Sequence, residues 1–230
     1  MKKVSVVIPA YNEEASIGST LRAIRERILC QELIVVDDGS VDDTAQLARQ
    51  WADLVISTPQ NRGKGAALQA GWQHASGDVV MLLDSDLRES AAEAAHLLSP
   101  VIAGACDMSV AVLPPPRQKA GMGLAKGLAR HGIRILTGFE PRAPLSGQRA
   151  FRREVLQRLG RLDNGFGVEV GLTVDAIRAG YRVLEVPVRF SHRETGNDWS
   201  GYFHRGKEFV AIGRTLCHKW WEGQGWRQNG

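Results

Sequence analysis

Apolar runs alternate with helix-forming segments over the first hundred residues of the chain, and this alternation constrains its fold more than any other feature. Short uninterrupted apolar runs are typical of strands buried on both faces of a sheet. Strands that alternate with helices of about ten residues indicate right-handed βαβ units and a mainly parallel sheet. We expect strands at Val4–Ile8, Glu32–Val36, Leu54–Ser57 and Asp78–Leu83, and helices at Glu13–Arg27, Asp43–Ala52 and Gly65–Ala75.

The second half of the chain has a less regular pattern. We expect one α/β domain with a mixed, mainly parallel sheet and helices on both faces over residues 1–200, followed by a helical, aromatic and basic tail over 201–230. The expected helices are Glu89–Leu98, the basic amphipathic Gln118–Thr137, Arg152–Leu159 and Val168–Ala179, and the expected strands are Ala105–Val112 and Arg182–Phe190.

The composition narrows the class of function. The chain has 230 residues and a net charge of +4, which suits an anionic substrate or an anionic membrane surface. No aromatic-basic nucleic-acid module is present, so we expect no nucleic-acid partner. Three widely spaced cysteines (Cys30, Cys106 and Cys217) indicate neither a disulfide framework nor a zinc site, and predict a reducing cytoplasmic location. No apolar run is long enough to span a membrane.

Two carboxylates, Asp84 and Asp86, flank Ser85 directly after the apolar run Val79–Leu83. Open α/β sheets keep their ligand crevice at the carboxyl ends of the strands. Carboxylate oxygens there suit Mg²⁺ or Mn²⁺, which typically bind through one or two carboxylates and the phosphates of a substrate. An acidic loop that caps the following helix is the alternative interpretation.

Polar motifs also follow three other expected secondary-structure elements. Pro9–Glu14 and Asp37–Ser40 follow the first two strands, and Asn61–Gly65 precedes a helix with glycines for close backbone approach and with Arg62 and Lys64 available for phosphate. The spacing is neither that of a P-loop nor that of a dinucleotide fingerprint. A nucleotidyltransferase would need a glycine-rich basic loop after the first strand, where this chain has Ala10–Glu13.

The sequence VSVVIPAYNEEASIGSTL, together with ELIVVDDGSVDDT, NRGKGAALQAG and DVVMLLDSDL, resembles the successive motifs of family 2 glycosyltransferases with the GT-A fold. The resemblance implies a nucleotide-diphospho-sugar donor, either a GDP- or a UDP-sugar, and a divalent cation on its diphosphate. It implies a donor-binding half over 1–100 and an acceptor-binding half over 101–200. The residues implied to bind the donor are Pro9, Tyr11, Glu13, Asp38, Arg62, Lys64, Asp84 and Ser85, and Asp86 is implied to be the direct and catalytic metal ligand.

The sequence SGQRAFRREVLQRL, which starts at Ser146, resembles a pattern of polyprenyl-phosphate mannosyl- and glucosyltransferases. That resemblance implies that Ser146, Gln148, Arg149 and Arg152 face an acceptor phosphate, for which guanidinium groups are well suited. Gln148 replaces the usual aromatic residue of this pattern. The alternative interpretation is an ordinary basic loop that enters a helix.

The sequence GFGVEVGLTVD, with His192, also resembles glucosyl-phosphoglycerate synthases, which transfer glucose to a small phosphorylated acid. In the polyprenyl-phosphate transferases an acidic residue near the acceptor corresponds to Glu169. His192 follows a strand and is expected to complete the metal sphere, with a structural histidine as the alternative, and Arg193 is expected to neutralise the leaving diphosphate. We therefore predict a metal-dependent glycosyltransferase with a polyprenyl-phosphate acceptor. The alternatives are a small phosphorylated acceptor or a non-catalytic nucleotide-sugar-binding scaffold.

The C-terminal tail combines tryptophans with basic residues, a composition that suits attachment to the inner face of the cell membrane. Packing against the domain, or against a second copy in a homodimer, is the alternative.

Overall fold

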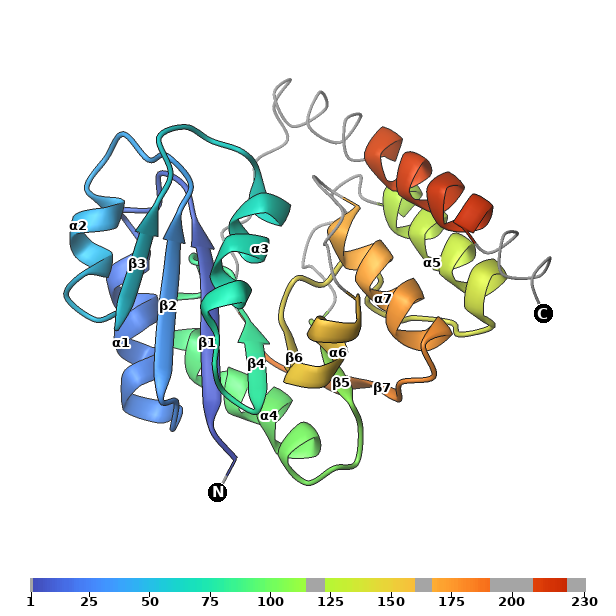
Figure 1. Cartoon of the computed structure of the whole chain (residues 1–230), viewed down its shortest axis with the longest axis horizontal. Helices are drawn as coiled ribbons and strands as arrows, with labels where there is room; N and C mark the ends of the chain where they lie inside the picture. Colours follow the sequence, from blue (N-terminus) through green and yellow to red (C-terminus); the bar gives the residue numbers. More distant parts are fainter. Residues whose placement is uncertain (1, 115–122, 160–166, 191–208, 223–230) are drawn as a thin grey trace.

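A computed structural model of the chain describes residues 2–114, 123–159, 167–190 and 209–222. The strands of these residues form one sheet in the order β3-β2-β1-β4-β6-β5-β7 (Figure 1). The strands are β1 (Val4–Ala10), β2 (Glu32–Asp37), β3 (Leu54–Ser57), β4 (Val79–Leu82), β5 (Met108–Val112), β6 (Arg149–Arg152) and β7 (Val183–Pro187). The helices are α1 (Ile17–Arg27), α2 (Thr44–Ala48), α3 (Lys64–His74), the 3₁₀ helix η1 (Arg88–Ala94), α4 (Ala95–Ile102), α5 (Gly123–Thr137), α6 (Arg153–Leu159) and α7 (Val168–Arg178), followed by an unlabelled helix at 209–222.

The first four strands are parallel, as their apolar runs predict. β1 is central, with Val7 beside Ile34 of β2 on one side and beside Leu82 of β4 on the other. β3 extends this half of the sheet beyond β2. The loops that follow β1, β2 and β4 therefore leave the sheet at the same edge, which we call the carboxyl edge.

β6 is a strand that the sequence analysis did not predict. The expected helix at Arg152–Leu159 begins at Arg153, and the four residues before it pair antiparallel with both β4 and β5. In this register Arg149 lies beside Leu82, at the carboxyl end of β4, and Arg152 lies beside Val79, at its amino end. The sheet is therefore mixed and mainly parallel, as predicted, with one antiparallel strand at its centre.

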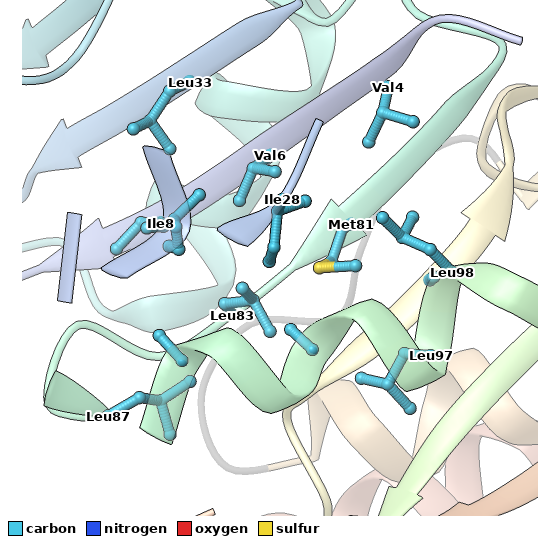
Figure 2. Close-up of a cluster of buried hydrophobic side chains, with 14 of the residues drawn as sticks. Val4, Val6, Ile8, Ile28, Leu33, Met81, Leu83, Leu87, Leu97 and Leu98 are labelled. Atoms are coloured by element: carbon cyan, nitrogen blue, oxygen red, sulfur yellow. The ribbon is translucent and has the colours of Figure 1, made fainter. Parts of the chain in front are cut away.

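Helices cover both faces of the sheet, and each face has its own apolar core. One core joins α1, α2, η1 and α4 to the face of β1 that carries Val6 and Ile8. Figure 2 shows this cluster, which includes Met81, Leu83, Leu87 and Leu97. The other core joins α3, α6 and α7 to the opposite face. This double coverage explains why the central strands are continuous apolar runs.

A third apolar cluster lies outside the sheet and joins α5, α7 and the helix at 209–222. Ile212 of this last helix packs with Ile133 of α5 and Val174 of α7. Figure 1 shows the helix, in red, lying along α5. The predicted helical tail is therefore partly described, and its helix packs on the domain.

Candidate functional site

The loops after β1 and β2 are tied together at the carboxyl edge. The Asn12 amide donates to Ser40 Oγ at 2.9 Å, and the Val41 amide donates to Asn12 Oδ1 at 3.0 Å. The Glu13 amide donates to Thr44 Oγ1 at 2.7 Å. Because these bonds satisfy the backbone of residues 12 and 13 in a loop, α1 begins at Ile17 and not at Glu13 as expected.

Asp38 joins a third loop to the other two. Its carboxylate accepts hydrogen bonds from the amides of Arg62, at 3.0 Å, and Gly63, at 2.7 Å. The structure thus brings Asp38 and the basic loop to one place, but Asp38 is only 3% exposed and its carboxylate binds the backbone amides of that loop. Pro9 is buried in β1 beside Val36, whereas the Tyr11 ring is 45% exposed at the mouth of these loops.

Lys64, Asp84 and Glu169 form a charged cluster from three separate elements. Lys64 begins α3, Asp84 follows β4, and Glu169 lies in the first turn of α7. Lys64 Nζ lies 2.7 Å from Asp84 Oδ1 and 3.2 Å from Glu169 Oε1. The Lys64 ammonium therefore bridges the carboxylate predicted for the donor and the one predicted near the acceptor.

In this cluster, the nearby charges affect the pKa of Lys64 more than its burial does. Burial lowers the pKa of the Lys64 ammonium, but the nearby negative charges of Asp84 and Glu169 raise that pKa above its ordinary value. Lys64 is consequently a permanent cation between two carboxylates.

The loop before β6 closes over Asp84. Gln148 Nε2 donates to Asp84 Oδ2 at 2.5 Å, and Ser146 Oγ donates to Gln148 Oε1 at 3.3 Å. Gly147 lies against the same cluster, since a Cβ on this glycine would lie 3.3 Å from Asp84 Oδ1. The sequence analysis did not single out Gly147. In the sequence, the only indication of its role was its position between Ser146 and Gln148, two predicted site residues.

Arg149, which was predicted to face the acceptor, is buried next to the Ser146 loop. It is only 1% exposed, and its Nε and Nη1 donate to Ser146 O at 2.8 Å and Thr173 Oγ1 at 2.9 Å. Burial lowers the pKa of its guanidinium to about 10. Arg149 therefore joins the Ser146 loop to α7, and its contact with the acceptor stays a prediction.

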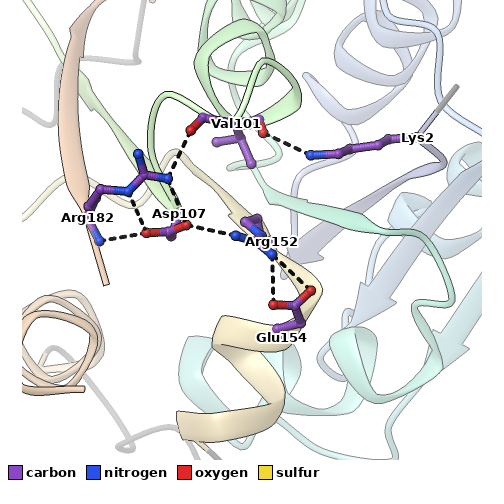
Figure 3. A network of polar contacts seen from close by, with 7 residues as sticks. Lys2, Val101, Asp107, Arg152, Glu154 and Arg182 are labelled. Atoms are coloured by element: carbon purple, nitrogen blue, oxygen red, sulfur yellow. Dashed lines mark hydrogen bonds and ion pairs between the residues drawn. The ribbon is translucent and has the colours of Figure 1, made fainter. Parts of the chain in front are cut away.

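Arg152 was also predicted to face the acceptor, and this prediction is wrong in position. The antiparallel register carries Arg152 to the opposite edge of the sheet, where it donates to Asp107 Oδ1 at 3.1 Å and to Glu154 (Figure 3). Arg182 donates to the other oxygen of Asp107, also at 3.1 Å. A cleft of about 450 Å³ at this edge is lined by Lys2, Asp78, Arg152, Arg153, Glu154 and Gln157.

Of the remaining predicted residues, two lie in the turn after β4 and two lie outside the described residues. Ser85 is buried and Asp86 is half-buried in the turn after β4. His192 and Arg193 lie outside the described residues and stay predictions. Over the described residues, no three His, Cys, Asp or Glu side chains gather as a complete metal cage. Two carboxylates that leave coordination positions for phosphate and water are the usual protein contribution to Mg²⁺.

This fold and site define a class of sugar-transferring enzyme. The model of the glycosyl transferase family 2 matches residues 5–160, so the chain belongs to that family and is a glycosyltransferase. The match spans β1 through α6, including both the Asp84 turn and the Ser146 loop.

Individual relatives agree with this family. An undecaprenyl-phosphate 4-deoxy-4-formamido-L-arabinose transferase of Salmonella paratyphi B is 31% identical over 86% of the chain, which spans 62% of that protein. An uncharacterised protein of Methanocaldococcus jannaschii is 28% identical over 84% of the chain and 83% of its own length.

Solved structures show the same fold. Glucosyl-3-phosphoglycerate synthase from Mycobacterium tuberculosis, in complex with Mg²⁺ and uridine diphosphate, has a TM-score of 0.80 and 31% identity over 95% of this chain and 79% of that one. Its complex with phosphoglyceric acid has a TM-score of 0.81 and 29% identity, over 95% and 80% of the two chains. Among the helices of the described ranges, none has the length and hydropathy needed to cross a bilayer.

Proposed function

We propose that this glycosyltransferase moves a sugar from a uridine-diphospho-sugar to a phosphate-bearing acceptor, a polyprenyl phosphate, with Mg²⁺ or Mn²⁺ as its cofactor. The observation that carries this proposal is the meeting of Lys64, Asp84 and Gln148 at one point of the carboxyl edge. This point joins the loop before α3, the end of β4 and the loop before β6. The solved relatives in complex with uridine diphosphate favour a uridine donor over a guanosine one.

The donor side would use the carboxylates that follow β4. Asp86 would ligate the cation, with Asp84 beside it toward the ribose or a metal-bound water, and His192 would complete the sphere. When bound, the cation would neutralise charge on the departing diphosphate. Lys64, Arg62 and Arg193 would place further positive charge there, while Tyr11, Pro9, Glu13 and Asp38 would shape the nucleoside pocket.

The acceptor side would use Ser146 and Gln148, with Glu169 beside them. In the transfer, the bond from the sugar C1 to the diphosphate oxygen breaks, and the diphosphate leaves with the electron pair. The acceptor phosphate oxygen forms the new bond to C1. That oxygen is already anionic, so the step needs no strong base and depends on positioning and charge. Lys64 supplies a fixed positive charge beside Asp84 and Glu169.

A lipid-linked acceptor is favoured by the outer face of the helix at 209–222. Val210, Arg214, Cys217 and Trp221 are exposed at helical spacing, and Trp220 and Trp221 are 50% and 75% exposed. We propose that this face contacts an anionic membrane surface on the cytoplasmic side. Exposed aromatic side chains next to basic ones are typical of helices that lie in a bilayer interface.

The charge of the neighbouring α5 supports the same partner. Lys126, Arg130 and Arg134 recur at every fourth residue on its exposed side, and residues 123–137 contain no Asp or Glu. Arg130 and Arg134 each pair with Glu140, at 3.6 and 3.7 Å. Basic side chains near an anionic leaflet each contribute about 1 kcal/mol to attachment.

A small soluble acceptor is the second candidate. It is supported by the TM-score of 0.81 with a synthase solved in complex with phosphoglyceric acid. Extraction of the reaction with butanol separates the two candidates. If polyprenyl phosphate is the acceptor, the labelled sugar enters the organic phase when that lipid is supplied. A labelled product that forms only with phosphoglycerate and stays in the aqueous phase would overturn the lipid acceptor.

The donor site is tested by Asp86→Asn, with Glu89→Gln as a matched control on an exposed carboxylate just beyond the turn. We expect Asp86→Asn to lower kcat about a hundredfold or more, as loss of a group that stabilises transition-state charge does. Glu89→Gln should keep full activity. Undiminished sugar transfer by Asp86→Asn would contradict the mechanism. If the wild-type chain binds the UDP-sugar but shows no turnover, the protein is a scaffold and not an enzyme of this mechanism.

The membrane contact is tested by flotation with vesicles of phosphatidylglycerol and phosphatidylcholine. The wild-type chain should float with the anionic vesicles, and Trp220→Ala/Trp221→Ala should not. Leu29→Ala/Ile102→Ala is the control, because these side chains are 64% and 41% exposed on other elements. The proposal would be contradicted if the tryptophan variant floated as well as the wild-type chain. It would also be contradicted if the wild-type chain formed a stable dimer and the tryptophan variant were a monomer.

A further inference from the structure

Thr20 is a buried hydroxyl that connects α1 to the turn holding Asp84 and Asp86. It lies among the apolar residues of the inner face of α1, between Ile17 and Leu21, and is 0% exposed. A hydroxyl at such a position must find partners, because an unpaired buried polar group is costly. Its partners lie across the interface that α1 forms with η1 and the end of β4.

The Thr20 hydroxyl forms hydrogen bonds with the backbone at two points of the turn. Thr20 Oγ1 donates to Ser85 O at 2.8 Å and accepts from the Arg88 amide at 2.7 Å. The carbonyl oxygen of Ser16, the residue before α1, is farther from the same hydroxyl, at 3.1 Å. The hydroxyl thus bridges the carbonyl between the two aspartates and the amide that follows them.

The turn needs such support because its backbone is strained. Arg88 has a φ of +51°, a left-handed conformation that residues other than glycine seldom adopt. Strained backbone persists only where the surrounding structure fixes it. The bond from the Arg88 amide to Thr20 is an interaction that fixes it here. Release of this bond would let the turn relax, and Asp86 would move relative to Asp84, whose carboxylate is bound by Lys64 and Gln148.

We propose that Thr20 is a positioning residue that sets the spacing of Asp84 and Asp86 for the divalent cation of the donor complex. This inference rests on the proposed function, because it concerns the same cation site. Thr20 itself contacts neither substrate nor cation. It acts on the site only through the backbone at Ser85 and Arg88.

Thr20→Val tests this role, because valine keeps the shape of threonine and removes the hydroxyl. Thr20→Ser is the matched control, because serine keeps the hydroxyl. Mn²⁺ affinity is measured by calorimetry with saturating UDP, and thermal unfolding is measured without metal. We expect Thr20→Val to bind Mn²⁺ about tenfold more weakly, and Thr20→Ser to bind within about twofold of wild type. Unchanged Mn²⁺ affinity in Thr20→Val would overturn the proposal, as would an equal loss in Thr20→Ser.

A second pair of variants covers a failure of Thr20→Val to fold. Arg88→Gly removes the strain, since glycine adopts positive φ freely. The proposal predicts that Thr20→Val/Arg88→Gly folds and binds Mn²⁺ more weakly than Arg88→Gly alone, because the Ser85 carbonyl has lost its partner. Equal affinities would overturn it. Absence of Mn²⁺ binding by the wild-type chain with UDP would instead contradict the donor site itself, and with it the role of Thr20.

Discussion

Gly147 and Lys64 lie so close together that a Cβ on Gly147 would lie 2.5 Å from Lys64 Nζ. The Lys64 ammonium is bound by Asp84 and Glu169, so moving aside would lengthen at least one of these ion pairs. The glycine therefore leaves the space in which the charged cluster forms.

Gly147→Ala should weaken donor binding about tenfold, because the added methyl displaces the Lys64 ammonium from Asp84. The measurement is the KM for the UDP-sugar together with its Kd. Gly18→Ala is the control, since no atom lies within 4 Å of the Cβ it would add. Full donor affinity in Gly147→Ala would show that the position of Lys64 does not matter for the donor.

Arg152→Ala should leave acceptor affinity unchanged, because the register of β6 places Arg152 at the edge remote from Asp84. It should lower the free energy of unfolding by about 1 kcal/mol, the usual contribution of a partly exposed charged hydrogen bond. Ser146→Ala should have the reverse effect, with a raised acceptor KM and little loss of stability. A raised acceptor KM in Arg152→Ala would contradict the placement of β6.

Stability should fall between about pH 4 and pH 2 through Asp107. Hydrogen bonds from Arg182 and Arg152 lower the pKa of its carboxyl to about 2, below the value of about 3.9 for an unfolded aspartate. The folded state therefore gains stability above pH 4 and loses it as Asp107 is protonated on acidification. The gain is about 1–2 kcal/mol, because both arginines are partly exposed. In denaturant titrations, the free energy of unfolding of Asp107→Asn should fall less between about pH 4 and pH 2 than that of the wild type. The activity of Asp107→Asn at pH 7 should be unchanged.

Gly71→Ala should destabilise the chain by about 1–3 kcal/mol, because a Cβ there would lie 2.4 Å from Val7 Cγ1 and 2.9 Å from Val36 Cγ2. Gly71 thus lets α3 pack closely on β1 and β2. Urea denaturation measures the change, and Gly18→Ala again provides a helix-glycine control. A stabilised Gly71→Ala would contradict the packing of α3 shown by these contacts.

The sequence predicted the parallel half of the sheet well, because strands buried on both faces must be apolar throughout. The same physics brings the loops after β1, β2 and β4 to one edge, so the meeting of Asp38, Lys64 and Asp84 was largely predictable. Thr20 had a weaker signal, namely a polar residue within the apolar stripe of α1.

The acceptor loop was less predictable because β6 is only four residues long and begins and ends with arginine. Two residues three positions apart share a face of a helix but point to opposite faces of a strand. The sequence analysis treated Arg149 and Arg152 as a pair that faces one ligand. As members of a strand they lie at opposite ends, so Arg149 lies next to the Ser146 loop and Arg152 lies at the opposite edge of the sheet.

The antiparallel strand at the centre of the sheet has a consequence for the order in which the chain is built. β1 to β4 are complete once residue 82 has been synthesised, but the free edge of β4 gains its neighbour only when residues 149–152 emerge. During that interval an apolar strand edge is unpaired, the kind of edge that promotes association between nascent chains. Fragments that end between β5 and β6 should therefore aggregate more than fragments that include β6, in which the edge of β4 is paired.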